Sequence, residues 1–358
     1  MNKKQRSTPK KVVTFGEVML RLTVPGFLRF SQTNDLIVSY GGSEANVAAS
    51  LANFGIPTEF VTRLPDNDIA RACIASLRSI GLGTEGIVFG GKRMGLYFLE
   101  SGAAFRNSNV VYDREDSSFA TLRPGMIDWE KVFADAGWFH WSGIAAALSQ
   151  DGADACLEAL EVADRMGLVI SCDLNFRKKL WNYGCSAAEV MRPLVQYSDV
   201  IFGAEPEYQE ILGITPVGFE AVNADYQLDL PAFKTFGCQV SKVLPRCRKI
   251  FLELRNTITS NHNLLAAVSY SEGELKQTGI YDIVREVDRV GAGDAFVGGM
   301  IYGLIRYPEA DQRVLDFALA ASTLKNTVYG DFNLVTVEEV EKLMSGNTEE
   351  HLGLLHCV

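Results

Sequence analysis

Short apolar runs alternate with helical patterns along most of the chain, and this alternation limits the fold more than any other feature of the sequence. Residues 12–20 (VVTFGEVML) and 58–64 (TEFVTRL) are typical of strands, whereas residues 43–55 and 66–81 have the apolar spacing of helices. Repeated strand–helix units of this size predict a mostly parallel sheet with helices on both faces. In such sheets ligands bind at the carboxyl ends of the strands.

Residues 92–119 interrupt the alternation. The runs GLYFLES and NVVYD are strand-like and have no helix between them, so we expect a small antiparallel piece that forms a lid over the main layer. The sequence therefore predicts one domain over 12–342, with lid elements around 15–40 and 92–119. Residues 1–11 are expected to form a flexible arm and residues 343–358 a C-terminal tail.

Bulk composition excludes several classes of protein. The net charge of −10 argues against a nucleic-acid partner. No apolar stretch reaches the roughly 20 residues of a membrane helix, and the basic N-terminus lacks the apolar core of a signal peptide. Seven irregularly spaced cysteines indicate reduced thiols, and four scattered histidines suggest no metal cluster. We therefore expect a cytoplasmic protein without a membrane partner.

The stretch DRVGAGDAFVGG (288–299) places glycines directly before an apolar helical run. Glycines there can aim free amides at one point, and with the helix dipole they form an anion site. Asp294 then makes chemical sense as a base beside a transferring phosphoryl group. The alternative is a tight turn in which Asp294 is only a favourable first-turn charge. The motif alone leaves both interpretations open.

The stretch GGSEANVA (41–48) is a second diglycine before a helix. Gly41 and Gly42 permit close approach of a ligand to the backbone, and Asn46 in the first turn could bind a sugar hydroxyl. The alternative is an ordinary loop with Ser43 as the helix N-cap.

Arg177, in DLNFRKKLW, follows an apolar strand and could bind a carboxylate or phosphate bidentately. Tyr97, Tyr112 and Arg114 lie in the expected lid, where strand alternation could present them to a polar ligand. The alternatives are a surface arginine in a loop and tyrosines that serve only packing.

Two distant segments together resemble the ribokinase-like (PfkB) carbohydrate kinases. DRVGAGDAFVGG is similar to their C-terminal signature Asp-Thr-Thr-Gly-Ala-Gly-Asp-x-Phe, and GGSEANVAASLANFG is similar to the N-terminal signature region. The resemblance extends over about 12–342. It implies a ribokinase-like three-layer α/β/α fold, with a mostly parallel central sheet and a small antiparallel β lid that often pairs subunits into a dimer or larger homo-oligomer.

Within that family the chain is most similar to 2-keto-3-deoxygluconate kinases, through GGSEAN, RMGLY, the YDR segment, DLNFRKKLW and a late Gly330–Asp331. The resemblance implies contacts to a sugar acid from Gly41, Gly42, Asn46, Tyr97, Tyr112, Arg114 and Arg177. Arg114 and Arg177 would bind its carboxylate.

The same resemblance implies phosphorylation of the C6 hydroxyl of 2-keto-3-deoxygluconate by ATP with Mg²⁺, and a monovalent cation in some relatives. Asp294 would be the base, and the amides of Gly291, Ala292 and Gly293 would form the anion hole.

Several positions depart from the family pattern. The N-x-x-E motif keeps Glu207, an indirect metal-binding residue, but has Ala204 in place of asparagine. The K-x-G-x-x-G turn is missing, so Arg255 and Asn326 are assigned to the nucleotide pocket only by resemblance. Arg289 and Val290 replace the two threonines of the signature, a change for which the sequence offers no reason.

Other functions stay open at this point. The same chemistry could act on a neutral sugar such as fructose or on a nucleoside, and a non-catalytic sugar-acid sensor could have kept the fold. A dinucleotide-binding dehydrogenase would need a G-x-G-x-x-G after the first strand, which is absent.

Overall fold

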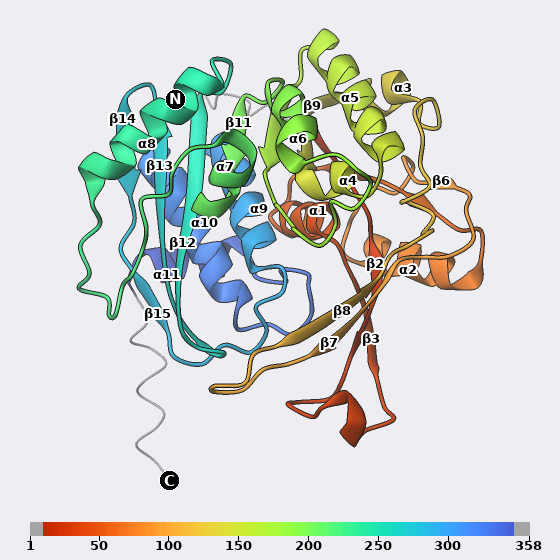
Figure 1. The fold of residues 1–358 in the computed structure, drawn as a ribbon, viewed down its shortest axis with the longest axis horizontal. Helices are drawn as coiled ribbons and strands as arrows, with labels where there is room; N and C mark the ends of the chain where they lie inside the picture. Colours follow the sequence, from red (N-terminus) through yellow and green to blue (C-terminus); the bar gives the residue numbers. More distant parts are fainter. Residues whose placement is uncertain (1–9, 347–358) are drawn as a thin grey trace, which may run out of the picture.

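A nine-stranded sheet forms the centre of the computed structural model, which describes residues 10–346 (Figure 1). The expected arm and tail fall largely outside these residues. The strand order is β14-β13-β12-β11-β10-β9-β1-β4, parallel from β12 to β4, with β13, β14 and β15 antiparallel. The strands are β1 (Lys11–Phe15), β4 (Thr58–Val61), β9 (Ala136–Ser142), β10 (Val169–Asp173), β11 (Val200–Phe202), β12 (Lys249–Thr259), β13 (His262–Ser271), β14 (Glu274–Gln277) and β15 (Tyr281–Ile283).

Helices cover both faces of this sheet. Alternate strand residues face opposite ways, so Val13 and Phe15 join one apolar core while Val12 joins the other. The first core includes α3 (Trp129–Phe133), α4 (Gly143–Ala147), α5 (Gln150–Arg165), α6 (Ala187–Val195), α7 (Glu205–Leu212) and α8 (Leu230–Val243). The second includes α1 (Ser43–Asn53), α9 (Ala292–Arg306), α10 (Asp311–Lys325) and α11 (Val337–Met344). The predicted three-layer α/β/α architecture is confirmed.

The expected strand over 12–20 is two strands in two sheets, because the chain leaves the large sheet after β1 and enters a smaller one as β2 (Met19–Thr23). The smaller sheet has the order β3-β2-β7-β8, with β3 (Ile37–Gly41), β7 (Leu96–Glu100) and β8 (Asn109–Asp113). The antiparallel piece predicted over 92–119 is confirmed as the pair β7–β8, whereas the small sheet as a whole is mixed because β2 and β7 are parallel. The remaining elements are η1 (Phe30–Gln32), α2 (Asp68–Ser79), β5 (Arg63–Leu64) and β6 (Val88–Phe89).

The small sheet lies across the carboxyl ends of the parallel strands (Figure 1). The far end of its β7–β8 hairpin contacts the tip of the β12–β13 hairpin, where Ser260 N donates to Ala104 O (2.8 Å) and Ser260 Oγ to Arg106 O (2.7 Å). Tyr97 pairs with both Arg21 and Tyr112, so these three side chains lie on one face of the small sheet. That face turns toward the large sheet.

Helix α9 is packed closely because of its glycines. A Cβ on Gly298 would lie 2.5 Å from the Ser50 Cβ of α1, and one on Gly299 would lie 2.9 Å from the Ala318 Cα of α10. The last two glycines of DRVGAGDAFVGG therefore serve helix packing, which fixes the N-terminus of α9 next to that of α1.

No helix within residues 10–346 is long and apolar enough to cross a membrane.

Candidate active site

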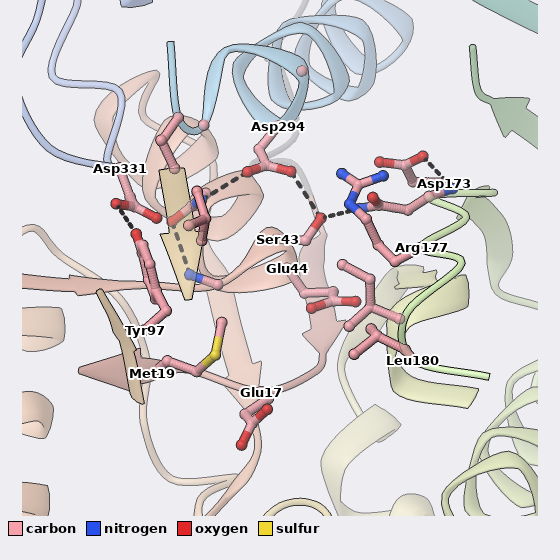
Figure 2. A pocket seen from close by; sticks show the side chains of 18 of the residues that line it. Glu17, Met19, Ser43, Glu44, Tyr97, Asp173, Arg177, Leu180, Asp294 and Asp331 are labelled. Carbon is pink, nitrogen blue, oxygen red and sulfur yellow. Dashed lines mark hydrogen bonds between the residues drawn. The ribbon is translucent and has the colours of Figure 1, made fainter. Parts of the chain in front are cut away.

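A cavity of about 720 Å³ lies between the small sheet and the carboxyl ends of β10, β11 and β12 (Figure 2). The N-termini of α1 and α9 also face it. Most of the residues singled out from the sequence line it: Gly42, Asn46, Tyr97, Tyr112, Arg114, Arg177, Glu207, Arg255, Gly291, Gly293 and Asp294.

The α9 N-terminus presents free backbone amides to the cavity. Gly291 is the N-cap in a left-handed conformation (φ +84°), and a Cβ there would lie 2.1 Å from Asp331 O, so only glycine fits. Within residues 10–346 the amides of Gly291, Gly293 and Asp294 have no hydrogen-bond partner, whereas Ala292 N donates to Arg289 O (3.1 Å). The Ala292 amide, assigned to the anion hole by resemblance, is thus used by the turn itself.

Asp294, in the first turn of α9, is held by two side chains of α1. Its Oδ1 accepts from Ser43 Oγ and its Oδ2 from Asn46 Nδ2, both at 2.7 Å. Burial raises the pKa of Asp294 to about 6, although the two hydrogen bonds partly oppose the rise. The carboxylate is therefore ionised at neutral pH but still basic enough to take a proton.

Two residues of this arrangement were not assigned from the sequence. Ser43 is not the N-cap of α1, which is Gly42, and its hydroxyl also accepts from Asn175 Nδ2 (2.9 Å). Asn175 has a positive φ of 39°, and its backbone amide donates to Asp173 Oδ1 (3.0 Å). The sequence signal available was Asn175 itself, which is part of the D-x-N-x-R pattern.

Gly41 and Gly42 are required by close packing. A Cβ on Gly42 would lie 2.0 Å from Glu17 O, and one on Gly41 would lie 1.9 Å from Asp331 Oδ2. Gly41 is not among the cavity-lining residues; it makes room for Asp331, whose Oδ1 accepts from Tyr97 Oη (2.6 Å).

The two candidate carboxylate-binding arginines differ in their surroundings. Arg114 is buried and its guanidinium forms a 2.7 Å ion pair with Glu17, so its charge is already neutralised. The side chain of Arg177 is 50% exposed, and its nearest acidic oxygen, Glu207 Oε1, is 3.5 Å away. Most of the Arg177 donors are free to bind a ligand.

Several carboxyl groups around the cavity floor have raised pKa values. Burial raises the pKa of Glu44 to about 7, and burial together with Glu207 raises that of Asp173. Burial likewise raises the pKa of Glu207, against the opposing charge of Arg177. Clustered shifts of this kind are typical of functional sites.

The residues assigned to the nucleotide are dispersed. Arg255 lines the cavity from β12, but Asn326 does not line it. Asn326 follows the last turn of α10, is 1% exposed, and its Nδ2 donates to Ser322 O (2.8 Å). Glu207 Oε2 accepts from Ala204 N (2.8 Å), so it caps α7 without the family's asparagine.

No group of three or more acidic, cysteine or histidine residues within 10–346 could hold a metal by itself. Mg²⁺ is nonetheless commonly bound through one or two carboxylates together with substrate phosphates. Glu207 faces the cavity with spare acceptor capacity on Oε1, so the residues present fit a metal ion that shares ligands with phosphate.

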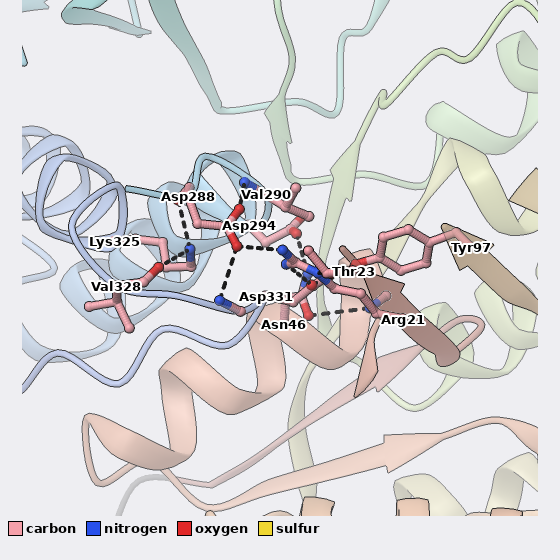
Figure 3. A network of polar contacts seen from close by, with 12 residues as sticks. Arg21, Thr23, Asn46, Tyr97, Asp288, Val290, Asp294, Lys325, Val328 and Asp331 are labelled. Carbon is pink, nitrogen blue, oxygen red and sulfur yellow. Dashed lines mark hydrogen bonds and ion pairs between the residues drawn. The ribbon is translucent and has the colours of Figure 1, made fainter. Parts of the chain in front are cut away.

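A buried charge network joins the small sheet to the loop before α9 (Figure 3). Arg21 of β2 donates to Asp288 Oδ2 (2.5 Å) and to Asp331 Oδ1 (2.7 Å). Lys325 is fully buried, and its ammonium donates to the carbonyl oxygens of Asp288 and Val328, both at 3.1 Å. The ammonium group of Lys325 thus lies at the loop before α9, which leads to the free amides.

Comparison with known proteins gives a consistent result. The sequence profile described as "pfkB family carbohydrate kinase" matches residues 9–227. A crystal structure of 2-dehydro-3-deoxygluconokinase from Thermotoga maritima superposes with a TM-score of 0.87, at 40% identity, over 94% of this chain and 100% of that one. A PfkB family carbohydrate kinase from Listeria grayi gives 0.84 at 30% identity, over 94% and 100%. The 2-dehydro-3-deoxygalactonokinase of Haloferax volcanii is 29% identical over 94% of this chain and 97% of its own length.

Proposed function

The chain belongs to the pfkB family of carbohydrate kinases, and we propose that its sugar substrate is 2-keto-3-deoxygluconate, phosphorylated by ATP at the C6 hydroxyl. The products would be 2-keto-3-deoxy-6-phosphogluconate and ADP. One observation carries the proposal: a basic carboxylate, Asp294, is fixed beside unpaired amides at a helix N-terminus.

In the proposed reaction the C6 oxygen attacks the γ-phosphorus of ATP while its proton passes to Asp294. The bond between the γ-phosphorus and the bridging oxygen breaks, and ADP leaves with that electron pair. The amides of Gly291, Gly293 and Asp294 donate to the oxygens of the transferring group, where negative charge is concentrated. Positioning and electrostatics supply most of the catalysis in phosphoryl transfer, so a base and an anion hole suffice.

Sugar-acid specificity would depend mainly on Arg177. Its half-exposed guanidinium can form a bidentate contact with the substrate carboxylate, whereas Arg114 is neutralised by Glu17. We therefore assign Arg114 to the positioning of Tyr112, whose ring lies 5.9 Å from the Arg114 guanidinium. Tyr112, Gly42 and Asn46 would contact the sugar chain.

Glu207 would hold Mg²⁺ indirectly, and the ion would neutralise phosphate charge when it enters with the nucleotide. The small sheet would act as the lid that keeps water out of the cavity, which limits wasteful hydrolysis of ATP. Together with the large sheet it would form the single kinase domain of 12–342.

The galactonate epimer of the substrate is the second candidate, because the Haloferax volcanii relative is a 2-dehydro-3-deoxygalactonokinase. The two sugars differ only in the configuration of one hydroxyl-bearing carbon, and both present a carboxylate to Arg177. Relative kcat/KM on the two epimers decides between them.

The test is an ADP-release assay with Mg·ATP against both keto-deoxy acids, fructose and a nucleoside. We expect turnover on a keto-deoxy acid, and Arg177→Ala should raise KM for that acid by about 10–100-fold. Arg165→Ala, an exposed arginine paired with Glu130 away from the cavity, is the control and should change nothing. Preferred turnover of fructose or the nucleoside would refute the substrate, and tight sugar-acid binding without any turnover would favour a sensor.

A further inference from the structure

Two arginine side chains from different elements line the same cavity wall. Arg255 comes from β12 and Arg289 from the loop before α9. The Arg255 side chain is three-quarters buried, yet its nearest acidic oxygen, Glu253 Oε2, is 3.7 Å away, beyond hydrogen-bonding distance. The Arg289 side chain makes no hydrogen bond or ion pair with any residue in 10–346, whereas its backbone oxygen accepts from Ala292 N. Neither guanidinium therefore donates a hydrogen bond to another residue in 10–346.

The two positive charges also act on each other. Desolvation of the Arg289 guanidinium by surrounding atoms and the charge of Arg255 together lower the pKa of Arg289 below its usual value. Glu286 attracts both guanidinium groups, but its carboxylate accepts from Asn263 Nδ2, and Glu253 accepts from Ser322 Oγ, so neither acid accepts a hydrogen bond from an arginine of the pair. Like charges held close together are unfavourable, and a bound anion that accepts from both guanidinium groups would reduce the repulsion.

The strand that bears Arg255 lies away from β1 in the large sheet, whereas Arg289 lies just before the N-terminus of α9. Asp294 is bonded to Ser43 and Asn46 of α1, so the hydroxyl to be phosphorylated would approach from that side. Arg255 belongs to β12, and β11, β10 and β9 separate that strand from β1. Arg289 in turn directly precedes the unpaired amides of α9 and accepts a hydrogen bond from Ala292 N. The anion expected at these arginines is therefore on the side of the phosphoryl donor.

We propose that Arg255 and Arg289 form a two-arginine subsite that binds the phosphate chain of the nucleotide. The inference rests on the proposed kinase function and adds residues to its nucleotide end. A polyphosphate carries several negative charges on oxygens that match the guanidinium fork, and two fixed forks can bind two successive phosphates. The subsite supplies charge where the chain lacks the family's K-x-G-x-x-G turn and the asparagine of N-x-x-E.

The subsite also gives a reason for the Arg289–Val290 pair. Val290 packs against Met19, Tyr97 and Leu99 on the inner face of the small sheet. Arg289 lines the main cavity together with Arg255, and it also lines a smaller cavity against the small sheet. A threonine at position 289 could offer only one hydroxyl to a phosphate.

The test measures binding of ADP, inorganic tripolyphosphate and adenosine to the full-length protein without sugar. We expect Arg255→Ala and Arg289→Ala each to weaken ADP and tripolyphosphate about 10–100-fold while adenosine binding is unchanged. Arg289→Lys should recover part of the loss, because it restores the charge but not the fork. Arg285→Ala, an exposed arginine on the same segment that does not line the cavity, is the control.

Several outcomes would overturn the subsite. These are wild-type ADP affinity in both alanine variants, equal losses for ADP and adenosine, or a raised KM for the sugar acid with nucleotide binding intact. The last result would move the arginines to the sugar end. Because binding is measured without sugar, a protein that fails to phosphorylate 2-keto-3-deoxygluconate can still pass this test, so the two proposals fail separately. Thermal unfolding and the Arg289→Lys variant identify any loss that comes from misfolding.

Discussion

Asp294 combines three properties that a proton acceptor in phosphoryl transfer needs. It is ionised at neutral pH, it is fixed by Ser43 and Asn46, and it lies in the same helical turn as free amides. The two hydrogen bonds hold its oxygens in place, so little reorganisation is needed when the hydroxyl proton arrives.

We expect Asp294→Asn to fold and to bind sugar but to lose turnover by about 10²–10⁴-fold, the usual contribution of a positioned base. An asparagine keeps the size of the side chain and can still accept one of the two hydrogen bonds. Steady-state kinetics and sugar binding, measured on the same preparation, check this. A well-folded variant with wild-type turnover would remove Asp294 from the chemistry.

The pH dependence follows from the raised pKa of about 6. Because the base must be ionised, kcat/KM should be level above about pH 6 and should fall about tenfold per unit below it. Glu44, whose pKa is about 7, also titrates in this cavity, and Asp331 and Arg177 are charged neighbours of Asp294. The Glu44→Gln variant should therefore keep the fall of kcat/KM below about pH 6. A wild-type kcat/KM that stays constant from pH 5 to 7 would contradict the assignment of Asp294 as the base.

At the scale of elements, the N-terminus of α9 has two glycines with different roles. Gly291 needs its left-handed φ and has no room for a Cβ, whereas a Cβ on Gly293 would meet no atom within 4 Å. That open space is where the transferring phosphoryl group would lie.

We expect Gly293→Ala to unfold at nearly the wild-type temperature while kcat/KM for ATP falls at least tenfold, since the methyl group occupies ligand space. Gly291→Ala should instead lower thermal stability together with activity, because the strain is inside the protein. Differential scanning calorimetry and kinetics on the matched pair distinguish the two. A fully active Gly293→Ala enzyme would argue against binding of phosphate at this turn.

The buried network around Arg21 connects β2 of the small sheet to two loops of the large one. Arg21 donates to both Asp288 and Asp331, so removing it leaves two buried carboxylates without that ion pair, although the charge of Lys325 still acts on both. Breaking a buried pair by removal of one partner usually costs about 3–5 kcal/mol.

Arg21→Leu should accordingly reduce the free energy of unfolding by about 3–5 kcal/mol, as measured by chemical denaturation. Arg71→Leu is the matched control, because its ion pairs with Asp66 and Asp68 are exposed and should contribute at most about 1 kcal/mol. Equal effects of the two substitutions would show that the network adds little to stability.

For the whole molecule, local sequence patterns were sufficient to predict a mostly parallel sheet with helices on both faces. They also predicted that residues following the strands lie at the carboxyl ends of the sheet. Arg177 lies in the loop that follows β10, and Asp294 lies in the first turn of a helix marked by glycines; both features are visible in a short window of sequence. The family resemblance, based on two distant motifs, is confirmed by the profile match and by the 40% identical structure.

Long-range contacts could not be predicted in this way. Arg21 looks like an ordinary strand residue, and its partners Asp288 and Asp331 lie 267 and 310 positions further along the chain. The pairing of Arg114 with Glu17 and the parallel contact of β2 with β7 also depend on how the small sheet folds back. Alternation within one strand assigns a side chain to a face, but it does not identify the partner across the sheet.

The outer face of the small sheet leads to the last prediction. Val38, Leu22, Phe98 and Val111 are aligned across its four strands, opposite to the face that bears Tyr97. Val38 is 58% and Val111 48% exposed. An apolar row that spans a whole sheet and faces solvent is typical of a protein–protein interface.

We expect this face to pair two copies of the chain, as the resemblance to lid-paired kinases implies. Val38→Asp with Val111→Asp should convert the oligomer to a monomer in multi-angle light scattering, because a buried unpaired charge is costly in an apolar interface. Val222→Asp, at a 77% exposed position in the loop before α8, should leave the assembly unchanged. A wild-type protein that is monomeric at micromolar concentration would rule the interface out. If the lid closes fully only when paired, the monomeric variant should also show a raised KM for the sugar, since Tyr97 and Tyr112 lie on the other side of the same four strands.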